Sequence, residues 1–318
     1  MISKNKLNVL IVSINKSPNK DIYVPRTYDE LYLPDEFYLN VEFDRLKYNV
    51  YFADQRDWTG EQFKQMYHSF EKTEPLSLEE ISLVLVYDVF LNEDNFQKLK
   101  SFLEFSIEKD IPVGNHPKTI LKTISKHYLK ELMNNGINVV KPYITTNDKI
   151  KLINSNKKLI KKDAIGGGGY GFQIIAGSDV ESFLEEKNII QEFMPQYSDG
   201  EYSLIFLNGL FKFAISRHRN KNSGRFTNVT QGASLKEYMP SIQEIEFAKS
   251  VLNYFYSLKL PILYARIDFI KTSSGPMLTE AELQQPITPF IFKQWYSKEF
   301  CNALDQWRIN WKDITTAS

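Results

Sequence analysis

The sequence predicts an α/β protein whose N-terminal third forms a parallel sheet and whose remainder, from about residue 116, is mixed α+β. Two observations carry this prediction. Short apolar runs alternate with a helical repeat in the first third, and the later runs are joined by turn signals typical of antiparallel pairing. The chain has 318 residues, which is enough for two or three domains with cores of their own.

Three apolar runs predict strands of the parallel sheet, because strands buried on both faces have nearly continuous apolar sequence. They are residues 8–14, 49–54 and 82–88. Residues 95–110 predict a helix, since apolar residues recur there at helical spacing: Phe96, Leu99, Leu103 and Ile107. Residues 111–115 return as a strand, and residues 19–37 predict a long loop at the sheet edge where α/β proteins bind ligands.

One helix is predicted at 117–135, between a first-turn proline and the capping Gly136. Its inward residues are expected to be Ile120, Ile124, Tyr128 and Leu132. A strand follows at 137–145, and then a hairpin formed by residues 157–163 and 172–177. Ser178 with Glu181 has the spacing of a capping box, which predicts a short helix at 178–187.

The C-terminal part predicts further strands and two helices. Residues 188–194 form a strand, and residues 201–219 form a hairpin that turns at Asn208-Gly209. A second capping box, Ser241 with Glu244, begins a helix that ends near Leu258. The remaining expected elements are strands at 262–271 and 277–283 and a helix at 288–307.

Charge and cysteine content exclude several classes of function. The 39 Lys and Arg residues balance the 39 Asp and Glu residues, so no overall field favours nucleic acid or an anionic membrane as a partner. The single cysteine, Cys301, excludes an intramolecular disulfide and a metal-thiolate cluster. With no signal-peptide pattern and no membrane-length apolar run, we expect a cytoplasmic protein.

The stretch LIKKDAIGGGGYG carries Lys161 and Lys162 next to four consecutive glycines. Glycine runs let backbone N–H groups approach an anion, and a neighbouring lysine adds positive charge for the same phosphates. The spacing is neither that of the Walker loop nor that of the dinucleotide-binding fingerprint. Taken alone, the stretch is equally compatible with a mobile hairpin.

Three carboxylates lie on two strands that are expected to pair. Glu280 and Glu282 are two residues apart and share a strand face, and hairpin pairing brings Asp268 beside them. Their mutual repulsion favours a cation between them, and oxygen ligands suit Mg²⁺. The alternative is a solvated acidic edge, which the surrounding apolar residues disfavour: Ile267, Phe269, Leu278 and Leu283.

A strand that ends at a proline, IIQEFMP, is a third feature. Its backbone can meet an adenine edge, while Gln191 and Glu201 can reach the base amine and the ribose hydroxyls. Without other features it is only a strand that leaves a sheet.

The order of these features resembles the ATP-grasp superfamily over about residues 110–300. The closest likeness is to its bacterial glutathione synthetase-like and cycloserine-forming cyclo-ligase-like branch. The resemblance implies three domains: a Rossmann-like pre-ATP-grasp domain at 1–115, a small lid subdomain with the glycine hairpin at 116–192, and a C-terminal subdomain with the metal-binding strands at 193–318.

The resemblance also implies roles for individual residues. The nucleotide is expected to contact Lys126, Lys161 or Lys162, Gly168, Gly169, Gln191, Glu192, Phe193, Met194 and Glu201, with Phe193 and Met194 acting through their backbone. The expected metal ligands are Asp268, Glu280 and Glu282. The chain departs from the family pattern at Ser125, at Asp163 and at Ala233, where Asp, Pro and Gly are usual.

Three arginines are the expected catalytic residues: Arg217, Arg225 and Arg266. A guanidinium group can hold a carboxylate or phosphoryl group by two hydrogen bonds, and the resemblance places Arg217 and Arg225 at the γ-phosphate and the acceptor carboxylate. Arg217 is also compatible with a solvated hairpin charge, and Arg266 with a structural partner for a carboxylate.

The implied activity is that of an ATP-dependent ligase. The γ-phosphoryl group of ATP is expected to activate a small carboxylic acid or amino acid as an acyl phosphate, which an amine or related nucleophile then attacks. ATP and Mg²⁺, or Mn²⁺ in its place, are the implied cofactors, and the resemblance allows a homodimer. Two alternatives stay open: a ligase that modifies a peptide or protein terminus, and a catalytically silent nucleotide-binding scaffold.

Overall fold

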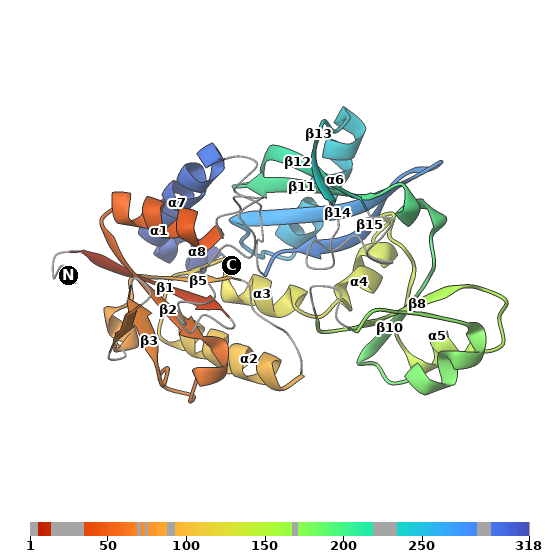
Figure 1. Cartoon of the computed structure of the whole chain (residues 1–318), viewed down its shortest axis with the longest axis horizontal. Coiled ribbons are helices and arrows are strands. Elements are labelled where there is room, and N and C mark those ends of the chain that lie inside the picture. Colours follow the sequence, from red (N-terminus) through yellow and green to blue (C-terminus); the bar gives the residue numbers. More distant parts are fainter. Residues whose placement is uncertain are drawn as a thin grey trace. The chain divides into compact units, whose positions relative to one another are not determined.

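The computed structural model describes residues 6–13, 35–68, 71–73, 76–87, 93–166, 171–218, 234–284 and 294–317. The chain divides into two compact units (Figure 1). Unit 1 comprises Met1–Leu121, Lys259–Tyr264 and Leu283–Ser318, and unit 2 comprises Lys122–Leu258 and Ala265–Glu282. The three domain ranges expected from the sequence stay a prediction.

Unit 1 contains a six-stranded sheet of order β4-β3-β2-β1-β5-β6. The strands β1 (Leu7–Ser13), β2 (Tyr48–Asp54), β5 (Leu83–Val86) and β6 (Val113–Gly114) are parallel to one another. The short strands β3 (Met66–His68) and β4 (Glu71–Thr73) extend the sheet in antiparallel fashion. Residues Val9 to Val12 of β1 are fully buried, which confirms the predicted parallel α/β sheet.

The helices of unit 1 come from both ends of the chain. They are α1 (Asp35–Arg45), α2 (Glu93–Glu108), α7 (Gln294–Ile309) and α8 (Trp311–Ala317), with 3₁₀ turns at η2 (Gln55–Asp57) and η3 (Leu78–Glu80). The helices α1 and α7 pack together (Figure 1), and Arg45 Nη2 donates to Asn302 Oδ1 at 2.8 Å. Residues 288–293 of the helix predicted at 288–307 lie outside the described residues. None of the described helices is long and apolar enough to cross a membrane.

The single helix predicted at 117–135 is two helices, α3 (Pro117–Thr123) and α4 (Tyr128–Asn134). Between them the Lys126 N–H donates to Ala164 O at 2.8 Å, and Ser125 pairs with Ile165. Long-range pairing has therefore replaced helical hydrogen bonds, although the helical repeat continues and its inward residues are all buried: Ile120, Ile124, Tyr128 and Leu132.

The first sheet of unit 2 is antiparallel, with the order β7-β10-β8-β9. Its strands are β7 (Pro142–Tyr143), β10 (Asn188–Glu192), β8 (Leu159–Asp163) and β9 (Gln173–Ile175), and α5 (Thr146–Ile150) lies beside it in Figure 1. One face packs Leu159 and Ile190 against Val180 of η4 (Gly177–Phe183).

Two predicted elements differ in this region. The helix predicted at 178–187 is the 3₁₀ helix η4, which ends at Phe183. Asp179 rather than Ser178 caps it by accepting from the Ala176 N–H at 2.9 Å. The strand predicted at 137–145 shortens to β7, because the Val140 N–H bonds Leu278 O and Asn138 O accepts from the Leu278 N–H. Residues 138–140 thus pair with a different sheet.

The second sheet of unit 2 has the order β13-β12-β11-β14-β15. Its strands are β13 (Ser234–Tyr238), β12 (Leu210–His218), β11 (Glu201–Leu207), β14 (Tyr264–Thr272) and β15 (Gly275–Glu282). The helix α6 (Ile242–Ser257) begins at the predicted capping box, in which Glu244 Oε2 accepts from the Ser241 N–H at 2.7 Å and Ser241 Oγ accepts from the Glu244 N–H at 3.3 Å. The predicted turn at Asn208-Gly209 joins β11 to β12 through left-handed backbone.

Candidate functional site

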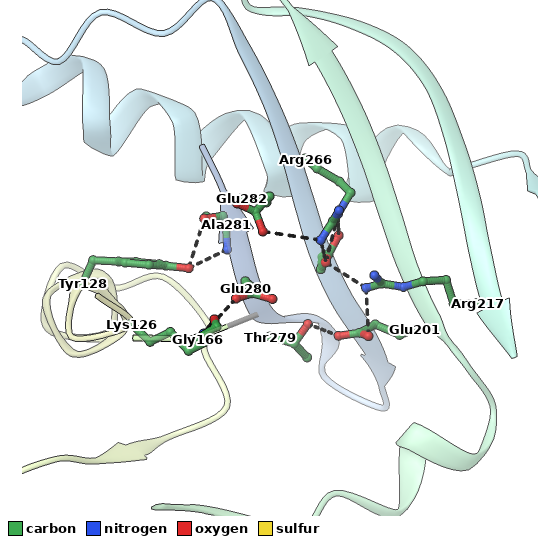
Figure 2. Close-up of polar contacts among 11 residues, drawn as sticks. Lys126, Tyr128, Gly166, Glu201, Arg217, Arg266, Thr279, Glu280, Ala281 and Glu282 are labelled. Atoms are coloured by element: carbon green, nitrogen blue, oxygen red, sulfur yellow. Dashed lines mark hydrogen bonds and ion pairs between the residues drawn. The ribbon is translucent and has the colours of Figure 1, made fainter. Parts of the chain in front are cut away.

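Charged side chains from four strands of the second sheet, from the α3–α4 connection and from β8 of the first sheet lie in one cluster of unit 2. Figure 2 shows the members that come from the second sheet and the α3–α4 connection. The four carboxylates are Glu201, Asp268, Glu280 and Glu282, and the four cationic groups are Lys126, Lys162, Arg217 and Arg266. The formal charges of this cluster balance. Most of its members are buried, which is unusual for Lys, Arg, Asp and Glu and requires that they be paired.

Asp268, on β14, is completely buried between two arginines. Arg266 Nε lies 3.0 Å from Asp268 Oδ1, and Arg217 Nη2 lies 2.7 Å from Asp268 Oδ2. Burial opposes ionisation of Asp268, but the charges of Arg217 and Arg266 outweigh it and lower the pKa of this carboxyl to about 2. Asp268 is therefore a carboxylate over the whole physiological pH range.

Glu201, the first residue of β11, is held at both oxygens. Arg217 Nη2 donates to Glu201 Oε2 at 2.8 Å, and Thr279 Oγ1 donates to Glu201 Oε1 at 2.5 Å. The guanidinium of Arg217 thus bridges Glu201 and Asp268. With 8% of its surface exposed, Arg217 is no solvated hairpin charge, and that alternative is wrong.

The strand β15 carries Glu280 and Glu282 opposite β14, where Asp268 pairs with Glu280 and Arg266 pairs with Glu282. Lys126 Nζ lies 3.4 Å from Glu280 Oε1 and donates to Gly166 O at 2.5 Å. Burial, together with the charges of Glu280 and Asp268, raises the pKa of Glu282 to about 7 against the opposing charges of Arg266 and Lys126. Because Asp268 and Glu282 are almost fully buried, the cluster is not a solvated acidic edge.

Lys161 and Lys162 lie on opposite faces of β8. Lys161 Nζ donates to Asp163 Oδ1 and lies 5.6 Å from the ring centroid of Phe183. Lys162 shares the other face with Ile160, and burial lowers the pKa of its ammonium group. The carboxylates whose charges act against this lowering are those of the cluster: Glu280, Glu201 and Asp268. Lys162, and not Lys161, belongs to the cluster.

Gln191 and Glu192, which were expected to contact the nucleotide, lie on opposite faces of β10 for the same reason. Gln191 pairs with Ile160 and lies on the Lys162 face of the sheet. Its Nε2 donates to Val140 O at 2.6 Å, whereas its buried Oε1 has no hydrogen-bond partner among the described residues. Glu192 lies on the opposite face, where it accepts from Lys157 Nζ and from the Tyr143 hydroxyl.

The backbone groups of Phe193 and Met194, which were expected to contact the nucleotide, are partly used in hydrogen bonds within the chain. The Phe193 N–H donates to Lys158 O at 2.9 Å, and Met194 O accepts from the Tyr197 N–H at 3.1 Å. Gly168, Gly169 and Arg225, three residues expected at the site, lie outside the described residues.

The carboxylates fit a divalent cation only in part. No group of three or more His, Cys, Asp or Glu side chains within the described ranges is arranged to hold a metal ion. Both oxygens of Asp268 accept from arginines. Glu280 and Glu282 remain suitable oxygen ligands. The raised pKa of Glu282 reflects burial and negative charge that a cation between the two glutamates would offset.

Three residues of the cluster's surroundings were not expected from the sequence. Thr279 holds Glu201, and the Tyr128 hydroxyl both accepts from the Ala281 N–H and donates to Ala281 O. The buried hydroxyl of Tyr197 has no hydrogen-bond partner among the described residues, and burial and then the charges of Glu201 and Glu280 raise its pKa. A threonine or tyrosine next to a motif carries no spacing signal, so only the fold reveals these contacts.

No protein-family model matches the sequence, and no curated protein matches it either. Solved structures do match. The chain is similar to D-cycloserine synthetase DcsG, with a TM-score of 0.71 and 15% identity over 94% of this chain and 99% of that one. It is also similar to the D-alanine–D-alanine ligase from Bacillus anthracis complexed with ATP, with a TM-score of 0.64 and 12% identity over 96% and 99% of the two chains.

A third similar structure is the ATP-grasp ligase PsnB, complexed with a phosphomimetic variant of its minimal precursor, Mg and ADP. Its TM-score is 0.58, with 12% identity over 94% of this chain and 98% of that one. At such identities the likeness establishes the fold alone.

Proposed function

We propose that this chain, which has the fold of the ATP-grasp ligases, is an ATP-dependent ligase that joins a small carboxylic acid or amino acid to an amine or related nucleophile. ADP and phosphate are the other products. The acid would be activated as an acyl phosphate. The observation that carries this proposal is the largely buried, charge-balanced cluster of four carboxylates and four cationic side chains in unit 2.

The nucleotide would be held by residues of unit 2. Lys126 and Lys162 are the cations for its phosphates, and the glycine run that follows β8 supplies further N–H donors. The unpaired Oε1 of Gln191 suits the adenine amine, and Glu201 suits the ribose hydroxyls. The contact expected through the Phe193 N–H is not part of this proposal, because that group donates to Lys158 O.

In the first step a carboxylate oxygen of the substrate attacks the γ-phosphorus, the bond from that phosphorus to the β,γ-bridging oxygen breaks, and ADP leaves. Mg²⁺ bound by Glu280 and Glu282 would offset the charge of the phosphates. Arg266 is the group proposed to meet the transferred phosphoryl oxygens, because Asp268 keeps its guanidinium fixed in place.

In the second step the nucleophile attacks the acyl carbon, and the carbon–oxygen bond to phosphate breaks. The amine loses a proton, and inorganic phosphate is released. The chain's contribution is mainly positional, since a bound amine next to an acyl phosphate needs orientation more than acid–base assistance. Arg217 has a supporting role in this proposal: it neutralises the charges of Asp268 and Glu201 through hydrogen bonds to both carboxylates.

Hydroxylamine trapping tests the proposal, because it converts an acyl phosphate into a stable hydroxamate. The protein is incubated with ATP, Mg²⁺, hydroxylamine and pools of amino acids or peptides. We expect hydroxamate and ADP with at least one pool. Lys162→Ala should reduce the rate by roughly 100-fold, in the range for the loss of a transition-state charge contact, whereas the matched control Lys161→Ala should stay within about threefold of the wild type.

The remaining outcomes separate the alternatives. Hydroxamate formed only with peptide pools would identify a peptide-modifying ligase, a second candidate that the likeness to PsnB and its precursor supports. ATP binding without hydroxamate in any pool would identify a silent scaffold. Equal losses in both lysine variants would contradict the assignment of Lys162.

A further inference from the structure

The end of β10 and the turn that follows it contain several buried polar atoms without partners. The side-chain oxygens of Gln191, Gln196 and Tyr197 are buried, and none of the three has a hydrogen-bond partner among the described residues. Folded proteins contain few such atoms, and each of them calls for an explanation such as a ligand. Their concentration in one short segment indicates that a bound molecule completes this part of unit 2.

Tyr197 lies in the turn η5 (Pro195–Ser198), whose backbone is held by hydrogen bonds on both sides of this residue. The Tyr197 N–H donates to Met194 O at 3.1 Å, and the Asp199 N–H donates to Gln196 O at 3.0 Å. The turn joins the segment expected to meet the nucleotide base to β11 of the second sheet. The backbone that carries the phenol ring is therefore fixed beside the proposed nucleotide site.

The hydroxyl of Tyr197 keeps its proton at physiological pH. Burial is the main cause that raises its pKa well above the ordinary value, and the charges of Glu201 and Glu280 raise the pKa further, against the opposing charge of Arg217. These three residues belong to the charge cluster, so the hydroxyl lies close to that cluster. It is a hydrogen-bond donor there without an acceptor among the described residues.

A buried hydroxyl without a partner is unfavourable in the folded protein, because it has lost the hydrogen bonds that water makes to it in the unfolded chain. Phenylalanine would fill the same space without this cost. The stability of the fold therefore does not explain the hydroxyl of Tyr197, whereas an oxygen atom of a ligand would supply its acceptor. A phosphate oxygen is well suited, because a hydrogen bond to a charged acceptor is stronger than one to a neutral acceptor.

We propose that Tyr197 is a further nucleotide-binding residue, whose hydroxyl donates a hydrogen bond to a phosphate oxygen of the bound nucleotide. This inference rests on the proposed function, which places the phosphates beside Lys126 and Lys162. Lys126 Nζ lies 3.4 Å from Glu280 Oε1, and Glu280 is one of the carboxylates close to the Tyr197 hydroxyl. Tyr197 would thus add a neutral, directional donor to the positive charges of the two lysines.

Tyr197→Phe tests the inference, because it removes the hydroxyl and keeps the ring. The dissociation constant of ADP is measured by calorimetry with Mg²⁺ present, and that of adenosine by displacement of ADP. We expect ADP to bind at least about tenfold more weakly, as for the loss of a hydrogen bond to a charged group, and adenosine to bind as in the wild type. The midpoint of urea unfolding without nucleotide should stay unchanged or rise, because the substitution removes an unpartnered hydroxyl.

Tyr254→Phe is the matched control in unit 2. The Tyr254 hydroxyl donates to Glu131 Oε2 at 3.0 Å, so it has a partner within the fold. Its removal should lower the midpoint of urea unfolding and leave the affinity for ADP unchanged. The two tyrosine variants should therefore differ in both measurements, and in opposite directions.

The outcomes separate this inference from the proposed function. A wild type that binds neither ADP nor ATP overturns the proposed function. Equal ADP affinity in the wild type and in Tyr197→Phe overturns only the role of Tyr197, as it would if a water molecule were the sole partner of the hydroxyl. Equal weakening of ADP and adenosine would place the contact at the nucleoside and overturn the phosphate contact. A lower unfolding midpoint in Tyr197→Phe would show that the hydroxyl serves the fold, and this result also overturns the inference.

Discussion

The carboxylate of Asp268 is wholly buried, so its charge has to be balanced inside the fold. Arg217 and Arg266 provide that balance, and they keep the pKa of Asp268 at about 2. Buried ion pairs of this kind add little net stability over apolar residues of similar size, although removal of one partner is strongly destabilising. The cluster therefore contributes little net stability, which agrees with the ligand-binding role proposed for it.

His116, in unit 1, is a second buried titratable residue with a defined environment. Its ring stacks on Trp311 with a centroid distance of 5.2 Å, and its Nδ1 accepts from the Lys118 N–H at 3.2 Å. It also lies directly before Pro117, the first residue of α3, so it caps that helix. Burial, and to a lesser extent the charge of Lys118, lowers the pKa of His116 to about 4.

This pKa predicts a loss of stability in mild acid. Between pH 6.5 and 4 the unfolded chain binds a proton at His116 that the folded chain excludes. The free energy of unfolding therefore falls as the pH falls through this window, and the contribution of His116 to stability is fully present only above it. At pH 5 the loss from this residue is at most about 2 kcal/mol relative to pH 7. Urea unfolding of the wild type and of His116→Asn at pH 5 and at pH 7 measures this loss of stability.

Asparagine is the matched replacement, because its side chain can still accept from the Lys118 N–H at the helix N-terminus. His127→Asn, at a half-exposed histidine, is the control. An equally steep loss of stability in His116→Asn and in the wild type would contradict the assignment.

The two adjacent lysines of β8 show that the sequence of a single strand does not determine which of its faces meets the charge cluster. Lys161 and Lys162 have the same chemistry and follow the same apolar run, and strand alternation requires only that they face opposite sides. Which side faces the cluster depends on the pairing of β8 with β10 and on the packing of η4. The sequence therefore predicted the pair and could not choose between its members.

At the scale of elements, strands and helices with local signals were predicted well. The capping box at Ser241 and the Asn208-Gly209 turn depend on residues within a few positions of one another, and both are present. The break between α3 and α4 depends instead on Lys126 and Ser125 pairing with residues 164 and 165. No local sequence pattern predicts this break, because the helical repeat of apolar residues continues across it.

Gly171, which lies shortly before β9, cannot readily be replaced by another residue for two reasons: its backbone conformation and a close neighbour. Gly171 has a φ of +73°, and a Cβ built on it would lie 1.9 Å from Asp163 Oδ2. Asp163 cannot turn away without loss of its contact with Lys161 Nζ. Gly136 has a similar φ of +83°, but nothing lies within 4 Å of its Cβ position.

This pair predicts a difference in stability. Gly136→Ala should cost about 1 kcal/mol for left-handed backbone alone, and Gly171→Ala should cost at least about 1 kcal/mol more, because of the added clash. Urea unfolding measures both. The double variant Asp163→Ala with Gly171→Ala should recover part of the additional loss; equal losses in the two single variants would show that the contact with Asp163 is unimportant.

At the scale of the whole molecule, every described residue of the charge cluster belongs to unit 2. A nucleotide that binds there stabilises the native structure around its contacts, and local opening of those segments becomes rarer. Unit 1 supplies none of these described residues.

Hydrogen–deuterium exchange with ADP and Mg²⁺ should therefore change unevenly along the chain. We expect slower exchange in β8, in the turn η5 (Pro195–Ser198) and in β15, and unchanged exchange in β1, β2 and β5 of unit 1. Samples with Mg²⁺ alone are the control. Slowing of equal size in the central strands of unit 1 would argue against a nucleotide site confined to the residues of unit 2.

The sequence by itself determined the parallel sheet of unit 1, most strands and caps, and the charged residues from which the site is built, because each of these follows from periodicity or spacing within a short segment. Only the tertiary structure decided that Lys162 faces the cluster, that a bulge turns Thr279 toward Glu201, and that Arg217 meets Asp268 across 51 residues of sequence. Strand register and counter-charge depend on which distant segments pack together, and a charged side chain has no partner until they do.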